Sequence, residues 1–497
     1  MADTLSEVNL AAVVEGHPAD APMLVSDGEV TTYGELRRRL AGVRGALLAA
    51  GVRPGDRVAL VSGNSPAFVV GLLAALGAGA AVVPLNPLAP PAELARQLTA
   101  VAPVAAVLGP GVDLPAAAQP ATVLHDDGAA GDPTSLAAAE AGPPAPLVER
   151  GTDDPAVLLF TSGTAGLPRA AVLTHGNLLA NVAQIQAQPG RSVSSADVAL
   201  GVLPLFHVFG LTVNLLTSLA DGASLVLVPR FAPAEALTLC ERHRVTVLTG
   251  VPPMFAALAA ASGPSGGNPL ASVRLAVSAG PLPDQVLADF QGRFSRPLYQ
   301  GYGLTEAAPV VTTSVLDGDP RPGSVGVPLP GVELRLVDAD GEEALVGDPG
   351  EVWVRGPNVF AGYWQDPEAT ARVLTVDGWL RTGDLGVLGD DGNLQLVDRA
   401  KDLIIVNGFN VVPAEVEAVL GRHPEVGEVA VVGVPSRSAG ESVKAVVVPA
   451  VGAVPTLSKL AAFAACHLAR YKCPTSLQLS DSIPRGPTGK VLRRQLR

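Results

Sequence analysis

The sequence has little lysine, little cysteine and no excess of positive charge. All five lysines lie at or after position 401, whereas the other 29 basic residues are arginines. The three cysteines, Cys240, Cys466 and Cys473, lack metal-ligand spacing, and their odd number favours reduced thiols in the cytoplasm over a disulfide framework. The formal net charge of −13 argues against nucleic acid as the main partner, because a phosphate backbone requires a basic surface.

Signals for secretion and for membrane spanning are also weak. Acidic residues interrupt the amino terminus and no basic segment precedes an apolar run, so we expect no signal peptide. The uncharged segment Val58–Ala92 is long enough to cross a bilayer, but glycines and prolines interrupt it. We therefore expect a buried helix over Ala67–Leu76 followed by a buried strand over Ala80–Leu85. Peripheral contact with a membrane stays open.

The chain of 497 residues is longer than one hydrophobic core normally supports, so we expect two or three domains. From residue 245 onward, short apolar strands alternate with helices, which predicts an α/β fold with a doubly wound sheet. Ligands of such sheets bind at the carboxyl ends of the strands. Here these ends carry Thr249–Pro252, Ser278–Gly280 and Gln300–Gly303.

Two helices and one connection are also expected in the first half of the chain. Thr32 is a candidate cap for a helix over Tyr33–Ala50, and Thr174 can cap a helix that runs to about Gln188. Residues 126–155 are rich in Asp, Gly, Pro and Ala, which predicts a surface connection.

The pattern changes in the last third of the chain. Short strands and tight turns in Gly323–Gln395 predict a small β-barrel or sheet appended to the α/β core. The final 95 or so residues have the pattern of a small α+β domain. Its helices are expected over Pro413–Leu420 and Leu457–Ala469, and its strands near Glu428–Val432 and Val443–Val448.

The clearest candidate binding loop is Phe160–Arg169, FTSGTAGLPR. Its glycines let backbone N–H groups approach a ligand, its hydroxyls add donors, and Arg169 adds a positive charge. Because Ala170–Leu173 has the pattern of a strand, the loop joins two strands, unlike the common phosphate loop that opens a helix. A polyphosphate site fits this pattern, with a polar hairpin turn as the alternative. The donors are Thr161, Ser162, Gly163, Thr164 and Gly166.

Six further motifs follow in order. They are PLFHVFG (204–210), GYGLTE (301–306), GEVWVRG (350–356), GWLRTGDLG (378–386), VDRAKDLIIVNGFNVVPAEVE (397–417) and IPRGPTGKVLR (483–493). Together with the loop, this set closely resembles the adenylate-forming superfamily, which includes acyl-CoA synthetases, peptide-synthetase adenylation domains and firefly-type luciferases. The resemblance covers nearly the whole chain.

The resemblance implies a reaction in two steps that uses ATP, Mg²⁺ and CoA. A carboxylate attacks the α-phosphate of ATP to give acyl-AMP and pyrophosphate, and a thiol then displaces AMP. The family combines a large N-terminal AMP-binding domain, here residues 1–400, with a small mobile C-terminal domain, here 401–497. Lys401 matches the hinge, Lys490 matches the catalytic lysine of the small domain, and Gly408 matches the thiol-tunnel loop.

The resemblance also assigns the nucleotide contacts. Glu306 matches the magnesium carboxylate, and an oxygen ligand suits this hard cation. Thr305 matches the hydroxyl that binds the α-phosphate, and Tyr302 matches the ring against adenine. Asp384 and Arg399 match the ribose contacts. The glycines expected beside the nucleotide are Gly280, Gly301 and Gly303.

The binding loop departs from the family pattern TSGTTGxPKG at three positions. Ala165 replaces a hydroxyl, Ala170 replaces a glycine, and Arg169 replaces a lysine. An arginine is a planar fork and a lysine a compact point charge, so the two are not equivalent. The change either follows the arginine bias of the chain or weakens catalysis.

The acid is expected to be apolar. Amino-acid-activating members carry an Asp where this chain has His207, and without it an α-ammonium would stay unpaired. His207 is either a pocket wall or a core histidine. The expected pocket is His207, Val208, Phe209, Gly210, Val251 and Ala279.

Together these features predict an ATP-dependent acid–thiol ligase for a medium- or long-chain fatty acid, with an aryl acid next. The rivals are an acyl-AMP ligase that loads a carrier protein and a degenerate nucleotide-binding protein without turnover. Gly323–Val397 looks too compact for the insertion typical of acyl-AMP ligases. A monomer or a homodimer is expected, acting on small molecules.

Overall fold

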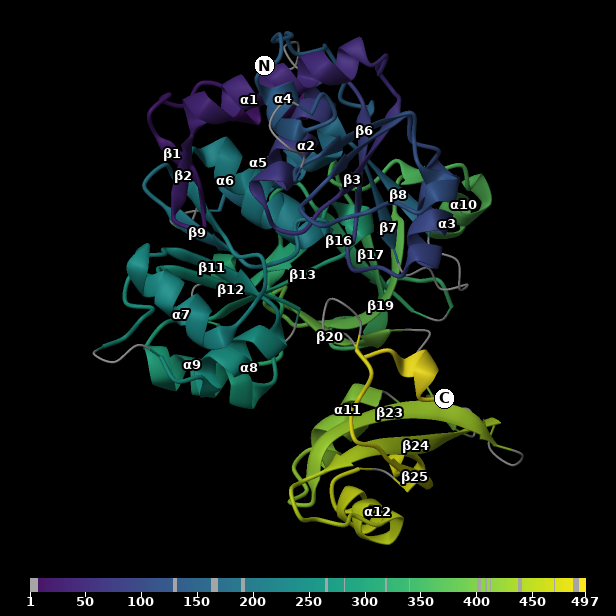
Figure 1. Ribbon diagram of the computed structural model, residues 1–497. Helices are drawn as coiled ribbons and strands as arrows, with labels where there is room; N and C mark the ends of the chain where they lie inside the picture. Colours follow the sequence, from purple (N-terminus) through teal and green to yellow (C-terminus); the bar gives the residue numbers. More distant parts are fainter. Residues whose placement is uncertain are drawn as a thin grey trace. The chain divides into compact units, whose positions relative to one another are not determined.

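The structure is a computed structural model that describes residues 8–127, 132–161, 169–188, 193–263, 267–280, 282–317, 320–338, 340–399, 404–406, 409–411, 413–436, 440–468, 470–485 and 491–497. The chain forms two compact units. The large unit consists of Met1–Glu333 and Val354–Leu380, and the small unit of Leu334–Trp353 and Arg381–Arg497 (Figure 1). The predicted domain boundary at residue 400 remains a prediction.

A seven-stranded sheet forms one half of the large unit, in the order β18-β8-β7-β4-β3-β5-β6. Its central strands are parallel, and β8 and β18 are antiparallel to their neighbours. The strands are β3 (Arg57–Val61), β4 (Ala81–Leu85), β5 (Ala105–Leu108), β6 (Thr122–His125), β7 (Pro155–Thr161), β8 (Arg169–Thr174) and β18 (Gly362–Tyr363).

Helices cover both faces of this sheet, as a doubly wound fold requires. The helix α2 (Pro66–Gly77) is buried along nearly its whole length, which explains the uncharged run that imitates a membrane span. At Gly71 an added Cβ would lie 2.9 Å from side-chain atoms of Leu60 and Val107, so the close packing of α2 depends on this glycine. The opposite face packs against Leu94, Leu98 and Val101 of α3 (Pro91–Val101).

Local capping explains two helix starts that the sequence predicts. Thr32 accepts a hydrogen bond from Glu35 N at the start of α1 (Tyr33–Ala49). Thr174 and Asn177 form a reciprocal capping box on α5 (His175–Gln186). The expected surface connection at 126–155 instead contains α4 (Leu136–Glu140), where Leu136 is buried.

A nine-stranded sheet forms the other half, in the order β15-β14-β13-β12-β11-β9-β10-β1-β2. Its six central strands are parallel, from β13 to β1, and the edge strands are antiparallel. The strands are β1 (Pro22–Ser26), β2 (Glu29–Thr32), β9 (Val198–Gly201), β10 (Ser224–Leu227), β11 (Val247–Gly250), β12 (Leu275–Ala279), β13 (Tyr299–Gly303), β14 (Val310–Thr313) and β15 (Val327–Pro328).

One face of this sheet packs on a row of helices through a core that includes Phe255, Phe290 and Phe294. These helices are α7 (Pro233–Arg242), α8 (Pro252–Ala260) and α9 (Asp284–Phe294). The other face meets the π-helix η3 (Gly210–Leu216), which continues into α6 (Thr217–Asp221).

The last elements of the large unit are short. They are α10 (Pro367–Val373) and the 3₁₀ turns η1 (Leu10–Val14), η2 (Ala116–Ala118), η4 (Thr305–Ala307) and η5 (Ser314–Asp317). The strand β13 begins at Tyr299 and includes the glycines of the GYG motif. Gly303 is sterically required, since an added Cβ there would lie 2.1 Å from the carbonyl oxygen of Pro309.

The small unit contains two sheets. The first, in the order β16-β17-β19-β20, corresponds to the predicted barrel or sheet, and the second has five strands with α11 and α12. The strands of the first are β16 (Glu333–Val337), β17 (Pro349–Arg355), β19 (Leu380–Leu388) and β20 (Leu394–Arg399). The second contains β21 (Ile404–Val406), β22 (Phe409–Val411), β23 (Val426–Ser436), β24 (Gly440–Pro449) and β25 (Ser476–Leu479).

The helices of the small unit are α11 (Pro413–Leu420), α12 (Leu457–Ala465), η7 (Arg470–Lys472) and η8 (Arg493–Gln495). The predicted helix at 413–420 is confirmed, and α12 ends four residues earlier than expected. Among the helices in the described part of the chain, none combines the length and the apolar character that a membrane span requires. The sheets and helices of the two units confirm the mixed α/β fold that the sequence predicts.

Candidate active site

The candidate phosphate loop is held by an antiparallel pair of strands. In the register of β7 and β8, Thr161 lies opposite Arg169, which confirms that the loop joins two strands. The Thr161 hydroxyl is 3.5 Å from the carbonyl oxygen of Arg169. The middle of the loop, with Ser162, Gly163, Thr164 and Gly166, lies outside the described residues, so its phosphate contacts remain predictions.

Arg169 is held from one side by a carboxylate. Its Nε atom lies 3.0 Å from Oδ2 of Asp366, and its guanidinium carbon lies 5.8 Å from the centroid of the Tyr363 ring. The other carboxylate oxygen of Asp366 accepts a hydrogen bond from Ala369 N and so caps α10. This bond and the contact with Arg169 lower the pKa of Asp366. Asp366 therefore stays ionised as the partner of Arg169.

Glu306 lies in the turn that follows β13 and is bound by Tyr363. The Tyr363 hydroxyl donates to Glu306 Oε1 at 2.8 Å, and Phe360 N donates to the carbonyl oxygen of Glu306 at 2.9 Å. Burial and the neighbouring Glu306 raise the pKa of Tyr363, so its hydroxyl stays a hydrogen-bond donor. The fold thus brings the predicted magnesium ligand and the predicted loop cation against one tyrosine, Glu306 at its hydroxyl and Arg169 over its ring.

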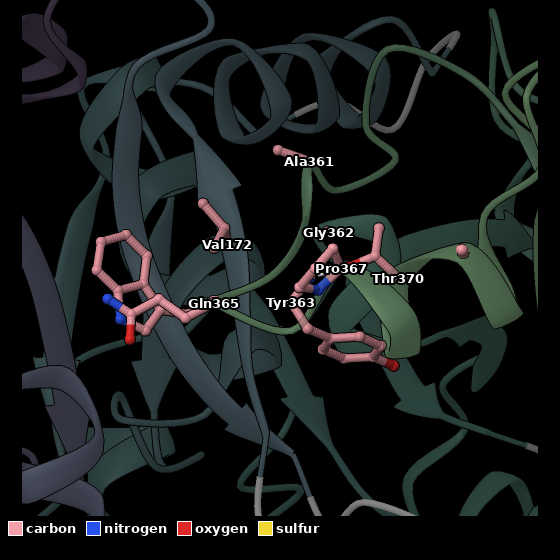
Figure 2. Close-up of a pocket in the computed structure, with 9 residues that line it drawn as sticks. Val172, Ala361, Gly362, Tyr363, Gln365, Pro367 and Thr370 are labelled. Atoms are coloured by element: carbon pink, nitrogen blue, oxygen red, sulfur yellow. Dashed lines mark hydrogen bonds between the residues drawn. The ribbon is translucent and has the colours of Figure 1, made fainter.

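A shallow depression of about 490 Å³ lies beside this network. It is lined by the chain around Tyr363 and by the first turns of α10, including Pro367 and Thr370. Figure 2 shows the ring of Tyr363 beside Pro367 and Thr370.

Gly280 and the expected nucleotide residues of the GYGLTE motif lie at the carboxyl ends of two neighbouring strands of the nine-stranded sheet. Strands β12 and β13 are parallel, with Ala279 opposite Gly301, so their carboxyl ends lie side by side. Gly280 has φ +88° and its N–H donates to Gly301 O at 2.6 Å. Tyr302 is buried, at 6 % exposure. Thr305 and Glu306 follow in η4.

The sequence placed Gln300 at this strand end but predicted no role for its side chain. Its side chain is fully buried; Oε1 accepts from Leu282 N at 2.7 Å and Nε2 donates to Arg321 O at 3.0 Å. Gln300 therefore ties the segment after Gly280 to the strand β13. The only sign of this role in the sequence was an amide side chain directly before the GYG motif.

The expected acyl-pocket residues lie around the start of the π-helix and the ends of two strands. Gly210 is sterically required, because an added Cβ would lie 2.3 Å from the carbonyl oxygen of Pro204. His207 Nδ1 accepts a bond from Phe209 N at 3.3 Å, and Val208 is buried. Val251 follows β11 and Ala279 ends β12.

Strand register and one hydrogen bond add Thr249, Val277 and Asn214 to the expected acyl pocket. Thr249 lies opposite Val277 in β11 and β12, and the Thr249 hydroxyl bonds to the Asn214 side chain on the π-helix. The opposite face carries Leu248 and Ala276, which pack on the helical core. Strand alternation could have placed Thr249 and Val277 on the π-helix side with Ala279, but Asn214 carried no comparable signal.

The two predicted ribose contacts share a register position in the small unit. Asp384 on β19 and Arg399 on β20 are directly opposite each other in an antiparallel pair. Asp384 is 8 % exposed, and its N–H donates to Thr382 Oγ1 at 3.1 Å. Gly383 has φ +70° and donates its N–H to Glu351 Oε1 at 3.0 Å, which holds this turn.

Three predicted residues of the small unit, Lys401, Gly408 and Lys490, lie outside the described residues. Arg485 and Val491, the nearest described residues before and after Lys490, form an antiparallel bridge. Their roles remain predictions.

The surroundings of Glu306 fit Mg²⁺. Within the described residues, no group of three or more His, Cys, Asp or Glu could hold a metal, so Glu306 has no protein cage. Mg²⁺ is usually bound by one or two carboxylates together with water and substrate phosphates. Within the same residues, Oε1 of Glu306 is occupied by Tyr363 and no hydrogen bond reaches Oε2. One carboxylate oxygen is thus available to a hard cation.

Comparisons with known proteins agree with this geometry. The AMP-binding enzyme family matches residues 10–364, and the AMP-binding enzyme C-terminal domain matches residues 415–490. The chain is 40 % identical to a feruloyl-CoA synthase of Amycolatopsis sp. over 95 % of this chain and 94 % of that protein. It is 36 % identical to a long-chain-fatty-acid–CoA ligase of Escherichia coli O157:H7, over 96 % and 92 %.

Among solved structures, ATP-bound MatB from Rhodopseudomonas palustris is similar, with a TM-score of 0.89, 34 % identity and 98 % of both chains covered. The fold, the edge residues and these matches agree with each other. The chain belongs to the AMP-binding enzymes of the adenylate-forming superfamily and, within it, to the acyl-CoA synthetases.

Proposed function

We propose that the protein activates an apolar carboxylic acid with ATP and transfers the acyl group to CoA. The observation that carries this proposal is that Glu306 and Arg169 both contact Tyr363, Glu306 at the hydroxyl and Arg169 over the ring. An acidic residue for a metal and a cation for phosphate are both needed when pyrophosphate leaves the α-phosphate of ATP.

In the first half-reaction, an oxygen of the acid attacks the α-phosphate and the bond to pyrophosphate breaks. Arg169 neutralises charge on the departing phosphates, and the Thr305 hydroxyl donates to the α-phosphate. Glu306 would hold Mg²⁺, which would supply further neutralisation of the triphosphate. Lys490 supports the same step from the small domain, and Lys401 is the hinge about which that domain turns.

In the second half-reaction, the sulfur of CoA attacks the acyl carbon and AMP leaves. Gly408 lies in the loop proposed to line the thiol tunnel. Asp384 and Arg399 retain the nucleoside through its ribose hydroxyls. ATP–pyrophosphate exchange reports the first half-reaction alone, so the two steps can be measured separately.

The acid is proposed to be a medium- or long-chain fatty acid. The wall of Val208, Phe209, Val251 and Ala279 carries no charged side chain, and ligases for long-chain fatty acids are among the relatives. An unpaired ammonium or a second carboxylate would be costly against such a wall. We also propose that the protein acts in the cytoplasm as a monomer or homodimer.

An aryl acid is the second candidate, because the chain is 40 % identical to a feruloyl-CoA synthase. The test is a panel of saturated acids of rising chain length and of aryl acids such as benzoate, ferulate and anthranilate. Each acid is incubated with ATP, Mg²⁺ and CoA, and the thioester is measured by mass spectrometry. A preference for ferulate over every saturated acid would replace the fatty acid by the aryl acid.

The same assays separate the other rivals. Acyl-AMP that accumulates in the presence of CoA, without a thioester, would indicate an acyl-AMP ligase that loads a carrier protein. Absence of acid-dependent ATP–pyrophosphate exchange across the whole panel would contradict the proposed enzyme and favour a nucleotide-binding protein without turnover.

A further inference from the structure

A single short segment, Phe360–Asp366, holds both charged groups of the phosphate site. We call it the bracket segment. Its backbone is attached to β8, because Ala361 N donates to Val172 O at 3.1 Å and Trp364 N donates to Ala170 O at 2.8 Å. It is also attached to the Glu306 turn, because Phe360 N donates to Glu306 O. The bracket segment therefore joins the loop strand to the turn that carries the magnesium ligand.

Tyr363 adds a side-chain contact at the centre of the bracket segment. Its ring packs edge-on against Phe360, with the centroids 5.0 Å apart, and Phe360 is 2 % exposed. A ring held in this way delivers its hydroxyl to Glu306 Oε1 in a fixed direction. Removing that donor would leave the Glu306 carboxylate free to rotate, because no other hydrogen bond to it is found in the described part of the chain.

Asp366 adds the second contact, at the end of the bracket segment. Its Oδ2 holds the Nε edge of Arg169, and within the described residues neither Nη atom of Arg169 makes a hydrogen bond. A guanidinium has separate nitrogens for two partners, whereas an ammonium has one nitrogen. Arginine at this position can therefore contact Asp366 and still present its Nη atoms to a phosphate.

We propose that Tyr363 and Asp366 are positioning residues that set the relative placement of Glu306 and Arg169. Tyr363 directs the second oxygen of Glu306 toward Mg²⁺, and Asp366 directs the Nη atoms of Arg169 toward the leaving pyrophosphate. The inference rests on the proposed function, but it concerns binding and can be tested without turnover.

The variant Tyr363→Phe tests the Glu306 contact. ATP binding is measured by calorimetry with Mg²⁺ and, separately, with EDTA. We expect the gain in affinity that Mg²⁺ provides to fall by about 10-fold, as for other residues that orient a metal ligand, while binding in EDTA is unchanged. An unchanged gain from Mg²⁺ in a folded variant would overturn this half of the proposal.

Tyr33→Phe is the matched control for that variant. The Tyr33 hydroxyl donates to the carbonyl oxygens of Ser218 and Ala223, so this variant also loses a tyrosine hydrogen bond. We expect it to lose stability without any change in the gain that Mg²⁺ provides. An equal loss of that gain in Tyr33→Phe would mean that the effect is general destabilisation, and this outcome would also overturn the proposal.

The variant Asp366→Asn tests the Arg169 contact. An asparagine retains the cap on α10 but carries no charge. We expect pyrophosphate binding, measured by calorimetry, to weaken by about 3- to 10-fold, and the same change to have no effect in an Arg169→Ala background. An equal loss in both backgrounds would mean that Asp366 does not act through Arg169.

Glu333→Gln is the control for the loss of an ion pair. Glu333 contacts Arg355, with Oε2 2.6 Å from an Nη atom, at an exposed position. We expect no change in pyrophosphate binding in this variant. If the wild-type protein binds MgATP and pyrophosphate but supports no acid-dependent exchange, the proposed function fails, while these binding measurements still decide whether Tyr363 and Asp366 position the two charged groups.

Discussion

Arg169 and Asp366 are 197 positions apart in sequence, yet Nε of one lies 3.0 Å from Oδ2 of the other. This contact bears on the replacement of the family's loop lysine by Arg169. The family's lysine would offer one nitrogen, whereas this arginine has one edge bound to a carboxylate and two nitrogens left over. The departure from the family pattern is therefore accompanied by a partner that suits it.

Replacing Arg169 by the lysine of the family pattern should slow ATP–pyrophosphate exchange. In Arg169→Lys the charge is kept, but one ammonium cannot hold Asp366 and the phosphates through separate nitrogens. We expect acid-dependent ATP–pyrophosphate exchange to fall by roughly 10-fold, less than for complete loss of a positioned donor. The initial rate of exchange with the preferred acid measures this. Unchanged or faster exchange would show that arginine occurs here only because of the composition of the chain.

Lys490 should be required for only one half-reaction. We expect Lys490→Ala to lower exchange by at least ~10²-fold, by analogy with oxyanion donors, and to spare thioester formation from supplied acyl-AMP. Both rates are measured on the same preparation. Loss of both in a variant with the wild-type melting temperature would contradict the proposed role. Lys459→Ala is the control, because Lys459 contacts Glu425 at an exposed position.

Asp384 should control affinity for the nucleoside. Two charge-assisted hydrogen bonds to ribose hydroxyls are worth about 1.5–3 kcal/mol each. We expect Asp384→Ala to weaken AMP binding by at least ~10²-fold in calorimetry and to lose discrimination against 2′-deoxy-AMP. Asp390→Ala, at an exposed turn in the same unit, is the control. Preserved discrimination in Asp384→Ala would exclude the ribose contact.

Asp221 should destabilise the protein when it is ionised. Burial raises the pKa of this carboxyl to about 6, with the neighbouring Asp197 adding to the effect. A raised folded-state pKa contributes stability that is present below pH ~4 and is lost as the pH rises through about 6. Asn can keep the bond that Gln186 donates at 2.5 Å, so Asp221→Asn removes the charge and retains this bond.

Because Asp221 is partly solvated, we expect the gain in Asp221→Asn to be about 1 kcal/mol in the free energy of unfolding at pH 8. The gain should disappear at pH 4, where the wild-type carboxyl is protonated. Urea unfolding at the two pH values measures this. An equal effect at both pH values would mean that the charge of Asp221 is not the cause.

Asp197 should behave in the opposite way. Burial raises the pKa of its carboxyl, but hydrogen bonds from Arg274, Thr246 and Ser194 outweigh burial and lower it to about 2. This stability is present above pH ~4 and is lost as the pH falls toward 2. We expect Asp197→Asn to cost about 1–2 kcal/mol at pH 7 and progressively less in acid, as urea unfolding can show. A cost that does not depend on pH would exclude the ionised pair.

The sequence by itself determined the elements whose causes are local. Thr32 and Thr174 cap helices through bonds that reach three residues along the chain, so these starts could be predicted. Glycines at positions that leave no room for a Cβ, such as Gly210 and Gly303, were visible within their motifs. The order of the motifs determined the family, and with it the candidate residues from Thr161 to Lys490.

Only the tertiary structure decided which of these residues meet. Tyr363 reaches Glu306 across 57 positions and Gln300 reaches Arg321 across 21, and no local pattern marks either pair. Helix caps and strand alternation reflect interactions over a few residues, whereas such contacts depend on how whole sheets and helices pack. The motifs therefore named the charged groups of the phosphate site, and the packing of β18 on β8 placed Tyr363 against Glu306 and Asp366 against Arg169.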